Sequence, residues 1–322
     1  MAGPGRRAFL GGVAALATAG FGTAPAEARF DARLVGLQLS SVEDALTQDF
    51  TGTMRAVAEI GYRQVEAVRS IAGLTIGQVA EAARGLGLRC SSAHVTVPDL
   101  QPDAAGAFGR AREAGLDYLV CVTAWARDPS RIKPLAPSDP LVKLLGAETA
   151  FFANVMMNLS LDDYRWTADF LNEAGETARK AGVSLGYHNE IFEFAAKEGV
   201  VPYDLLLERT DPDRVFFQLD CGNMASAGFD PAAYLTRHPQ RFRLLHVKDL
   251  ARDQPIGGFR ATELGNGTLD LNKILRAAQQ APITGYFVEQ GASFDQGGRQ
   301  YQRPSLESAR ISFDYLKKLL AA

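Results

Sequence analysis

The chain has 322 residues, of which 47% are hydrophobic, and its 34 basic and 37 acidic residues leave a formal net charge of -3. This length and composition can bury one large core, and no second composition regime appears along the chain. The charge balance argues against nucleic acid or an anionic membrane as a partner, because both call for a basic surface.

Residues 1–28 differ in kind from the rest. Arg6 and Arg7 precede a stretch rich in glycine and alanine that is too short to remain as a membrane-spanning helix. The pattern resembles a twin-arginine export signal, and a general secretory signal is the alternative. We therefore expect an exported, periplasmic chain whose mature part, residues 29–322, has no membrane attachment after cleavage.

Three cysteines are an odd number for an exported protein. Cys90, Cys121 and Cys221 all lie in or at the end of apolar runs. We expect them to be small buried core residues rather than disulfide partners or reactive thiolates.

Eight short apolar runs alternate with segments of helical periodicity. Near-continuous apolar runs are typical of strands covered on both faces, as in a parallel sheet. We predict strands at residues 34–40, 63–68, 88–95, 117–123, 183–190, 214–220, 242–248 and 284–290. Repeated strand-helix units imply right-handed connections. Eight of them predict an α/β fold, a closed (β/α)8 TIM barrel in a single domain, with reactive residues at the carboxyl ends of the strands.

The helical segments carry their own signals. Apolar residues recur at helical spacing between residues 166 and 178 and again between 306 and 320. Gly61, Gly87, Gly115 and Gly182 each follow a helical stretch shortly before a strand, where a positive φ would end the helix.

Two connections are longer than the rest. Residues 125–156 are rich in proline and then apolar, and residues 251–270 are rich in glycine. We expect the first to form a loop and a short helix over the barrel mouth. Long loops on the catalytic face usually shape a substrate site, and plain solvated connections are the alternative.

Ligand-type side chains end four of the later strands: His188 and Glu190, then Asp220, His246 and Glu289. Each has a structural alternative, namely a helix cap, a hydrogen-bonded core histidine or an ion pair. Several carboxylates gathered at one end of a barrel are costly to desolvate without a cation. Imidazole and carboxylate are also the donors that divalent metals use. Together the residues predict a metal site.

An ordered set of segments resembles a known family. LGYHNEIFEF, QLDCGN, LLHVKD, ELGNGTLDLNKIL and GYFVEQ are similar to the xylose isomerase-like TIM-barrel family of sugar isomerases and epimerases, which also includes apurinic endonucleases. The likeness extends over nearly all of residues 33–320. It implies one divalent ion, Mn, Mg, Co or Zn, held by Asp220, His246, Glu289 and a fourth ligand. That ligand is either Glu190, where relatives often have a histidine, or His188, where other epimerases have the glutamate.

Such an ion suggests roles for the acidic residues. By bridging a carbonyl oxygen and the adjacent hydroxyl of a sugar, it lowers the barrier to removing the proton between them. Glu289 is the candidate base, with Glu190 or His188 as the opposing acid or base.

Three further residues are candidates for substrate binding. His94 resembles the substrate-contacting histidine of the family, with a core histidine as the alternative. Lys248 lies two residues after His246, hence on the same side of the strand, and could stabilise a developing oxyanion. A salt bridge to Asp249 or Glu263 is its structural alternative. Glu66, at the end of the second strand, looks like a carboxylate that binds sugar hydroxyls.

The predicted activity is epimerisation or isomerisation of an unphosphorylated keto sugar or glycoside through an enediolate. A 3-keto-glycoside lyase or hydratase that uses the same site is the close alternative, and a non-catalytic exported sugar-binding barrel is a third. A DNA repair nuclease is disfavoured by the presence of only four histidines and by the net charge of -3. A small carbohydrate is the expected partner, and a homo-oligomer is left open.

Overall fold

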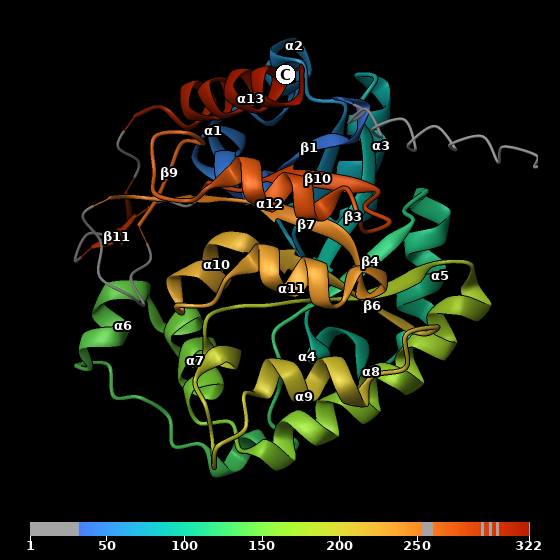
Figure 1. The fold of residues 1–322 in the computed structure, drawn as a ribbon, viewed down its shortest axis with the longest axis vertical. Coiled ribbons are helices and arrows are strands. Elements are labelled where there is room, and N and C mark those ends of the chain that lie inside the picture. Colours follow the sequence, from blue (N-terminus) through green and yellow to red (C-terminus); the bar gives the residue numbers. More distant parts are fainter. Residues whose placement is uncertain (1–31, 253–259, 291–292, 296–297, 301–302, 322) are drawn as a thin grey trace, which may run out of the picture.

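A computed structural model describes residues 32–252, 260–290, 293–295, 298–300 and 303–321, so the predicted export signal lies outside the described residues. Eight parallel strands close a barrel in the order β1-β10-β7-β6-β5-β4-β3-β2 (Figure 1). They are β1 (Val35–Gln38), β2 (Gln64–Ala67), β3 (Arg89–Val95), β4 (Tyr118–Val122), β5 (Ser184–His188), β6 (Val215–Asp220), β7 (Phe242–Val247) and β10 (Gly285–Val288). All eight predicted strands are present, and the predicted single-domain (β/α)8 barrel is confirmed.

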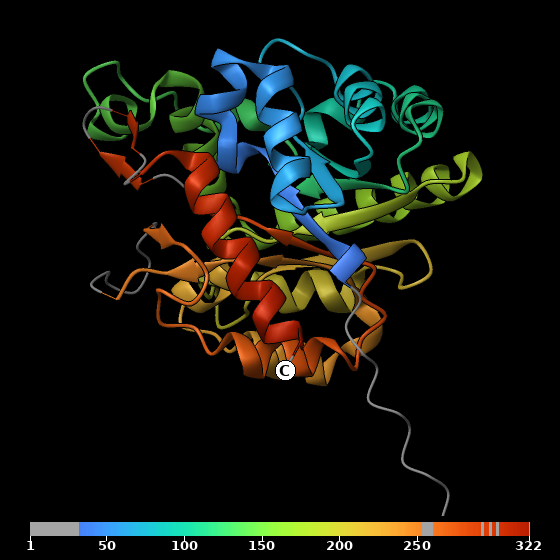
Figure 2. The same cartoon turned by 90° about the horizontal axis from the view of Figure 1, so that it is seen from above.

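One outer helix follows each strand and covers the barrel from outside (Figures 1 and 2). These helices are α2 (Phe50–Ile60), α3 (Ile76–Gly85), α5 (Ala104–Ala114), α8 (Leu161–Ala181), α9 (Pro202–Arg209), α11 (Pro231–Arg237), α12 (Leu271–Ala278) and α13 (Ser305–Ala321). Helix α13 packs against α2 and closes the ring. The Tyr62 hydroxyl, just after α2, donates to the Ala309 carbonyl at 2.9 Å.

Shorter elements lie in the connections. The helical ones are η1 (Ala32–Leu34), η2 (Leu39–Val42), α1 (Glu43–Gln48), α4 (Val97–Leu100), η3 (Pro129–Arg131), α6 (Pro140–Leu145), α7 (Ala147–Met157), η4 (Phe192–Phe194), α10 (Cys221–Ser226) and η5 (Pro239–Arg241). The remaining strands pair as two antiparallel ribbons, β8 (Asp249–Leu250) with β9 (Ala261–Thr262) and β11 (Ser293–Asp295) with β12 (Gly298–Gln300).

Helix α8 illustrates how local sequence specifies these elements. The Ser160 hydroxyl accepts from the Asp163 N–H, and the Asp163 carboxylate accepts from the Ser160 N–H, so the helix begins with a capping box. Its predicted apolar face is buried at Leu171 and Ala178. Gly182 ends it with φ of 75°. The positive φ predicted for Gly61, Gly87 and Gly115 is found as well.

The barrel interior has an apolar lower half near the amino ends of the strands. Val120, Phe216, Leu244 and Phe287 form a cluster of their own there, separate from the larger core between strands and helices. A Cβ on Gly186 would lie 2.5 Å from the Phe216 ring. Glycine is therefore required at this position, because a larger side chain and the aromatic ring could not both fill the barrel. We call this cluster the apolar plug.

Two insertions meet over the carboxyl end of the barrel. Residues 125–156, expected to form a loop and one short helix, instead carry two helices, α6 and α7, after β4. Helix α6 contacts the β11–β12 pair that follows β10. Because β4 and β10 lie on opposite sides of the ring, this contact spans the barrel mouth. The second long connection contains β8 and β9, whose pairing is organised by the Asp249 carboxylate; residues 253–259 of it lie outside the described part.

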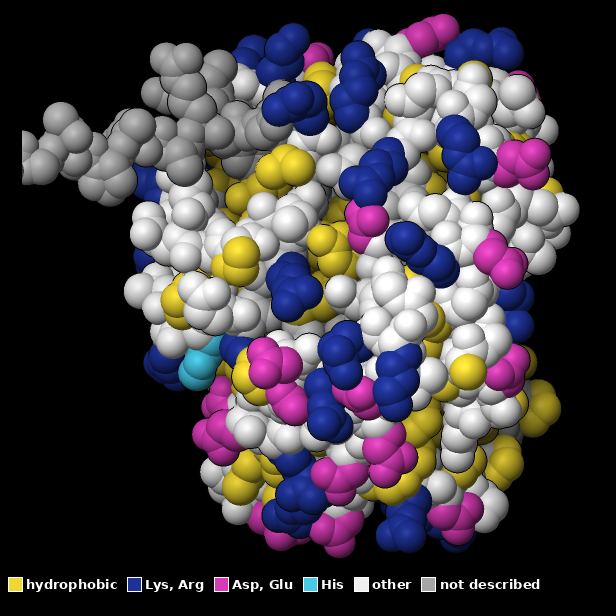
Figure 3. Space-filling model, turned by 90° about the vertical axis from the view of Figure 1, so that its right-hand side faces the viewer, with side chains coloured by type: hydrophobic (Ala, Val, Ile, Leu, Met, Phe, Trp, Pro, Cys, Tyr) yellow, Lys and Arg dark blue, Asp and Glu magenta, His cyan; other side chains and the backbone are white. Residues whose placement is uncertain are grey.

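The three cysteines are buried and free, as predicted. Among the described helices none is both long enough and apolar enough to cross a bilayer. On the face shown in Figure 3, lysine and arginine side chains are spread among acidic ones rather than gathered into one basic patch.

Candidate metal centre

Four ligand-type side chains converge at the carboxyl end of the barrel. His188 ends β5, Asp220 ends β6, His246 lies in β7 and Glu289 follows β10. One ligand atom from each lies within 4.8 Å of the others, and all but Glu289 are buried. The structure thus brings Asp220, His246 and Glu289 together, as the sequence predicted. Of the two candidates for the fourth position, it adds His188.

The donor atoms of this group suit a divalent cation. Oδ1 of Asp220 accepts from the Asn223 N–H at 2.8 Å and caps α10, whereas the buried Oδ2 lies 2.7 Å from the Lys248 ammonium. Nε2 of His188 lies 3.9 Å from that Oδ2. Nδ1 of His246 lies 2.8 Å from Oε2 of Glu289. Buried carboxylates need a facing cation, and in this structure the Lys248 ammonium is one. Two imidazoles with two carboxylates are in addition a donor set for a divalent ion.

A lysine supplies positive charge at the same place. The Lys248 ammonium lies 2.7 Å from Oδ2 of Asp220 and 3.0 Å from Oε2 of Glu289. Burial lowers the pKa of Lys248, but these carboxylates outweigh it and hold the pKa above its usual value. A Cβ on Gly222 would lie 2.6 Å from Cδ of Lys248, so glycine there leaves room for the lysine. The alternative ion pair with Asp249 or Glu263 is not formed: among the described residues, the Lys248 ammonium pairs with Asp220 and Glu289 instead.

Glu190 lies beside the group rather than within it. Strand β5 ends at His188, and Oε2 of Glu190 accepts from Nδ2 of Asn223 at 3.0 Å. Burial raises the pKa of Glu190 to about 8. A pKa raised in this way favours the protonated carboxyl at neutral pH.

The two glutamates are driven to opposite protonation states. Burial raises the pKa of Glu289, but Lys248 and His246 outweigh it and hold the pKa well below the usual range. An ionised carboxylate and a protonated one then face the same site, and such a pair is how enzymes assign base and acid. The base role of Glu289 and the acid role of Glu190 stay predictions.

Below the four residues lies a buried polar layer that contains Glu66 and His94. The Glu66 carboxylate is fully buried. Nε2 of His246 lies 2.5 Å from Oε1 of Glu66, and Nε2 of His94 lies 3.0 Å from the same oxygen. Burial raises the pKa of Glu66, but the two histidines outweigh it and hold the pKa well below the usual range. Glu66 thus contacts the histidines, and it has no exposed surface for the sugar hydroxyl that the sequence suggested.

The sequence reading missed three amides that connect these groups. Gln218 contacts His94, His188 and Glu66, whereas Gln38 donates to Glu66. Asn223 joins Glu190 to Lys248. Gln218 could have been found, because it lies two residues before Asp220 and so shares the inner side of β6.

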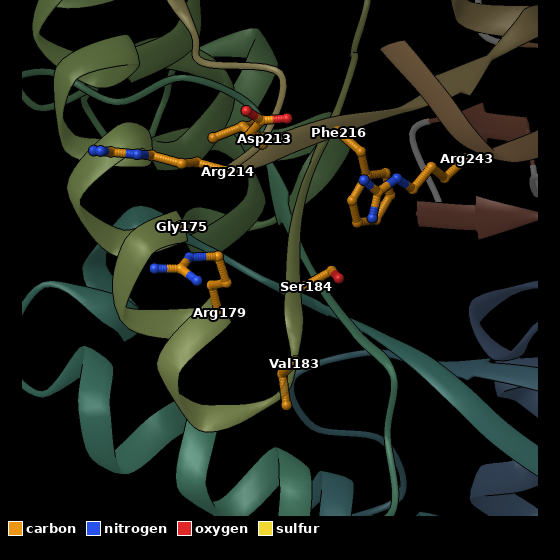
Figure 4. Close-up of a pocket in the computed structure, with 9 residues that line it drawn as sticks. Gly175, Arg179, Val183, Ser184, Asp213, Arg214, Phe216 and Arg243 are labelled. Atoms are coloured by element: carbon orange, nitrogen blue, oxygen red, sulfur yellow. The ribbon is translucent and has the colours of Figure 1, made fainter. Parts of the chain in front are cut away.

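A pocket at the opposite end of the barrel is unrelated to this site. It is lined by Arg179, Ser184, Arg214 and Arg243 among others, near the amino ends of β5, β6 and β7 (Figure 4). Arg179 and Arg214 already face the Glu176 carboxylate. None of the predicted catalytic or metal-binding residues lines this pocket.

The fold and the site define a (β/α)8 barrel of an enzyme superfamily, with a possible metal centre at the carboxyl end of its strands. The chain belongs to the xylose isomerase-like TIM barrel family, whose model matches residues 54–319.

Similar proteins agree with this assignment. An inosose dehydratase of Lacticaseibacillus casei is 26% identical over 140 residues, which are 39% of this chain and 46% of that protein. The chain therefore matches about half the length of that relative. A sugar phosphate isomerase/epimerase of Parabacteroides distasonis has a similar structure, with a TM-score of 0.65, 21% identity, and coverage of 88% of this chain and 97% of that one. The IolI protein with a bound zinc atom gives a TM-score of 0.62 at 12% identity over 89% of this chain and 98% of that one. These two structures show the fold alone.

Proposed function

We propose that this protein is a divalent-metal-dependent enzyme that removes the proton next to the carbonyl of a keto sugar or keto-glycoside. The observation that carries the proposal is the convergence of His188, Asp220, His246 and Glu289 within 4.8 Å. A divalent ion held there would supply a Lewis acid for the substrate's carbonyl and hydroxyl oxygens.

The chain's own residues would move the protons. The ionised Glu289 takes the proton from the carbon next to the carbonyl, and the electron pair of that C–H bond moves toward the carbonyl oxygen. The Lys248 ammonium, 3.0 Å from Glu289, lies near this charge and stabilises it. Return of a proton to the other face of the carbon, or to the neighbouring carbon, gives epimerisation or isomerisation.

A second outcome of the same step is loss of water or of an alcohol. If the β-carbon carries a hydroxyl or a glycosidic oxygen, the electron pair can expel it, and the protonated Glu190 donates a proton to the leaving oxygen. Similarity to an inosose dehydratase supports this dehydratase or lyase alternative. The raised pKa of Glu190, about 8, supports it as well.

Two measurements on the wild-type protein test the proposal. Metal analysis after loading with Mn²⁺ should find one ion per chain. Incubation in D2O with a panel of inososes, keto sugars and 3-keto-glycosides should show deuterium incorporation by NMR, and a chelator should abolish it. Deuterium without loss of water indicates an isomerase or epimerase, whereas an enone product indicates a dehydratase or lyase. No bound metal and no exchange across the panel would refute the proposal.

We also propose that residues 1–28 direct export, which favours unphosphorylated substrates because sugar phosphates are mainly intracellular. Arg6 and Arg7 in front of an apolar stretch support this proposal. Replacing both arginines by lysine should leave the protein in the cytoplasm of a host with a twin-arginine pathway. Unchanged export of that variant would favour the general secretory alternative.

A further inference from the structure

The Glu66 carboxylate occupies the centre of the polar layer and accepts hydrogen bonds on both oxygens. Oε1 lies 3.0 Å from the Gln38 amide nitrogen and 2.5 Å from Nε2 of His246. Oε2 accepts from the Ser92 hydroxyl at 2.5 Å and from the Gln218 amide nitrogen at 2.8 Å. An ionised carboxylate has about four acceptor positions, and these four donors, with Nε2 of His94 also 3.0 Å from Oε1, surround both oxygens.

The carboxylate also fixes the orientation of the Gln218 amide. Glu66 can only accept, so Gln218 must turn its nitrogen toward Glu66 and its oxygen away. That oxygen lies 3.0 Å from Nδ1 of His188 and 2.8 Å from Nε2 of His94. Since a carbonyl oxygen can only accept, both of these ring nitrogens carry hydrogens.

These contacts determine which ring nitrogens face the candidate metal centre. His246 donates from Nε2 to Glu66, so its Nδ1 points toward Glu289. His188 donates from Nδ1 to Gln218, so its Nε2 points toward Asp220. Partners on the far nitrogen commonly set the orientation and basicity of a metal-binding histidine.

Register shifts in the sheet place Glu66 and Gln218. The register between β2 and β3 shifts at Val65/Glu66, which sets Ser92 opposite Glu66. The register between β6 and β7 shifts at Phe217/Gln218, and Asp220 then lies opposite His246. Bulges next to functional sites often re-aim side chains in this way.

We propose that Glu66 is the positioning residue of the metal centre: it orients His246 directly and His188 through Gln218, so that Nδ1 of His246 and Nε2 of His188 face the ion. This inference rests on the metal binding in the proposed function, and it gives Glu66 a role other than sugar binding. His94 belongs to the same network, because its Nε2 contacts both Glu66 and Gln218.

The structure also defines the competing arrangement. His94, His188 and His246 form a second group whose ligand atoms lie within 4.8 Å of one another. The ring nitrogens that face Glu66 and Gln218 could instead bind a second ion directly. Glu66 would then be a ligand of that ion rather than a positioning residue, and the chain would hold two ions.

The main test is metal affinity measured by titration calorimetry with Mn²⁺ on the full chain. Glu66→Gln should weaken binding about 10- to 100-fold, because an NH2 donor replaces one of the two acceptor oxygens. Glu193→Gln is the matched control: Glu193 is also fully buried, but it accepts from the Tyr187 hydroxyl and has no contact with the four ligands. Its Mn²⁺ affinity should stay within about threefold of wild type.

Two further measurements keep the test independent of folding. Gln218→Leu retains the contact between Glu66 and His246 and should weaken binding less than Glu66→Gln. Long-range ¹⁵N NMR of the zinc-loaded wild type should show hydrogen on Nδ1 of His188 and on Nε2 of His246, with His238 as the fourth histidine for reference.

The outcomes separate this inference from the proposed function. One ion per chain with unchanged affinity in Glu66→Gln, or the opposite hydrogens in NMR, overturns the role of Glu66 and leaves the metal enzyme standing. Two ions per chain also overturn it, in favour of Glu66 as a ligand. A wild type that binds no ion overturns both proposals.

Discussion

The two halves of the barrel interior share strands β6 and β7 but have opposite chemistry. The lower half is the apolar plug around Phe216 and Phe287, whereas the upper half holds Glu66, Gln218 and the histidines. In β6 the inner positions run from Phe216 through Gln218 to Asp220. Successive inner positions of this strand therefore lie in the apolar plug, in the polar layer and at the candidate metal centre.

The lower half contributes mainly to stability, and the upper half mainly to the candidate site. Apolar burial in the plug stabilises the barrel and keeps water away from the polar layer from below. The polar layer is stable only if each buried group has a partner, because an unpaired one is costly in a low dielectric. Substitutions in the two halves should therefore have different consequences.

The largest expected effect is on stability, from Phe216→Ala in the plug. The ring is 3% exposed and packs where Gly186 leaves room for it, so its removal opens a cavity. The free energy of unfolding in urea should fall by about 3–5 kcal/mol, while the Mn²⁺ affinity of the folded protein should not change. A comparable loss of affinity would show that the two halves are not separable.

Glu289→Gln in the upper half should have the reverse pattern. Deuterium exchange into a keto-sugar substrate should slow by about 10²- to 10⁴-fold, because the amide cannot accept the proton. Circular dichroism should show an intact fold, and Glu193→Gln provides the control for replacing a buried glutamate. Exchange at the wild-type rate in Glu289→Gln would exclude it as the base.

Lys248→Met should destabilise the metal-free protein more than the Mn²⁺-loaded protein. Without metal, the substitution leaves Asp220 and Glu289 without their ammonium, and stability should fall by about 3 kcal/mol. With saturating Mn²⁺ the difference from wild type should shrink, because the ion then balances the carboxylates. Thermal unfolding of wild type and Lys248→Met, with chelator and with Mn²⁺, measures both stability differences. An equal loss of stability in the two conditions would contradict the role of Lys248 in balancing the carboxylates.

The smallest expected effect is a pH dependence from Glu190. With its pKa raised to about 8, Glu190 is protonated below that pH and loses its proton above it. Elimination, which needs the acid, should therefore decline as pH rises through about 8, by up to about tenfold per pH unit. Rates measured from pH 6 to 10 in wild type and Glu190→Gln give the comparison, and a decline that persists in Glu190→Gln must arise from another group.

Local sequence patterns were enough to predict the fold and the edge of the sheet that carries the candidate site. Near-continuous apolar runs specified parallel strands, and glycines such as Gly115 marked the helix ends. Because parallel strands end on one side, Asp220, His246 and Glu289 could be assigned to a common site before any coordinates.

Which side chains meet across the ring depends on how the folded barrel closes. Contacts such as Glu66 with His246 join residues 180 positions apart, and they depend on how the sheet closes and on the register shifts at Glu66 and Gln218. No local pattern encodes these shifts, although a shift of one residue changes which neighbour a side chain faces. Barrel closure therefore placed His188 within reach of the other three candidate ligands, paired Lys248 with Asp220 and Glu289, and put Glu66 between the histidines.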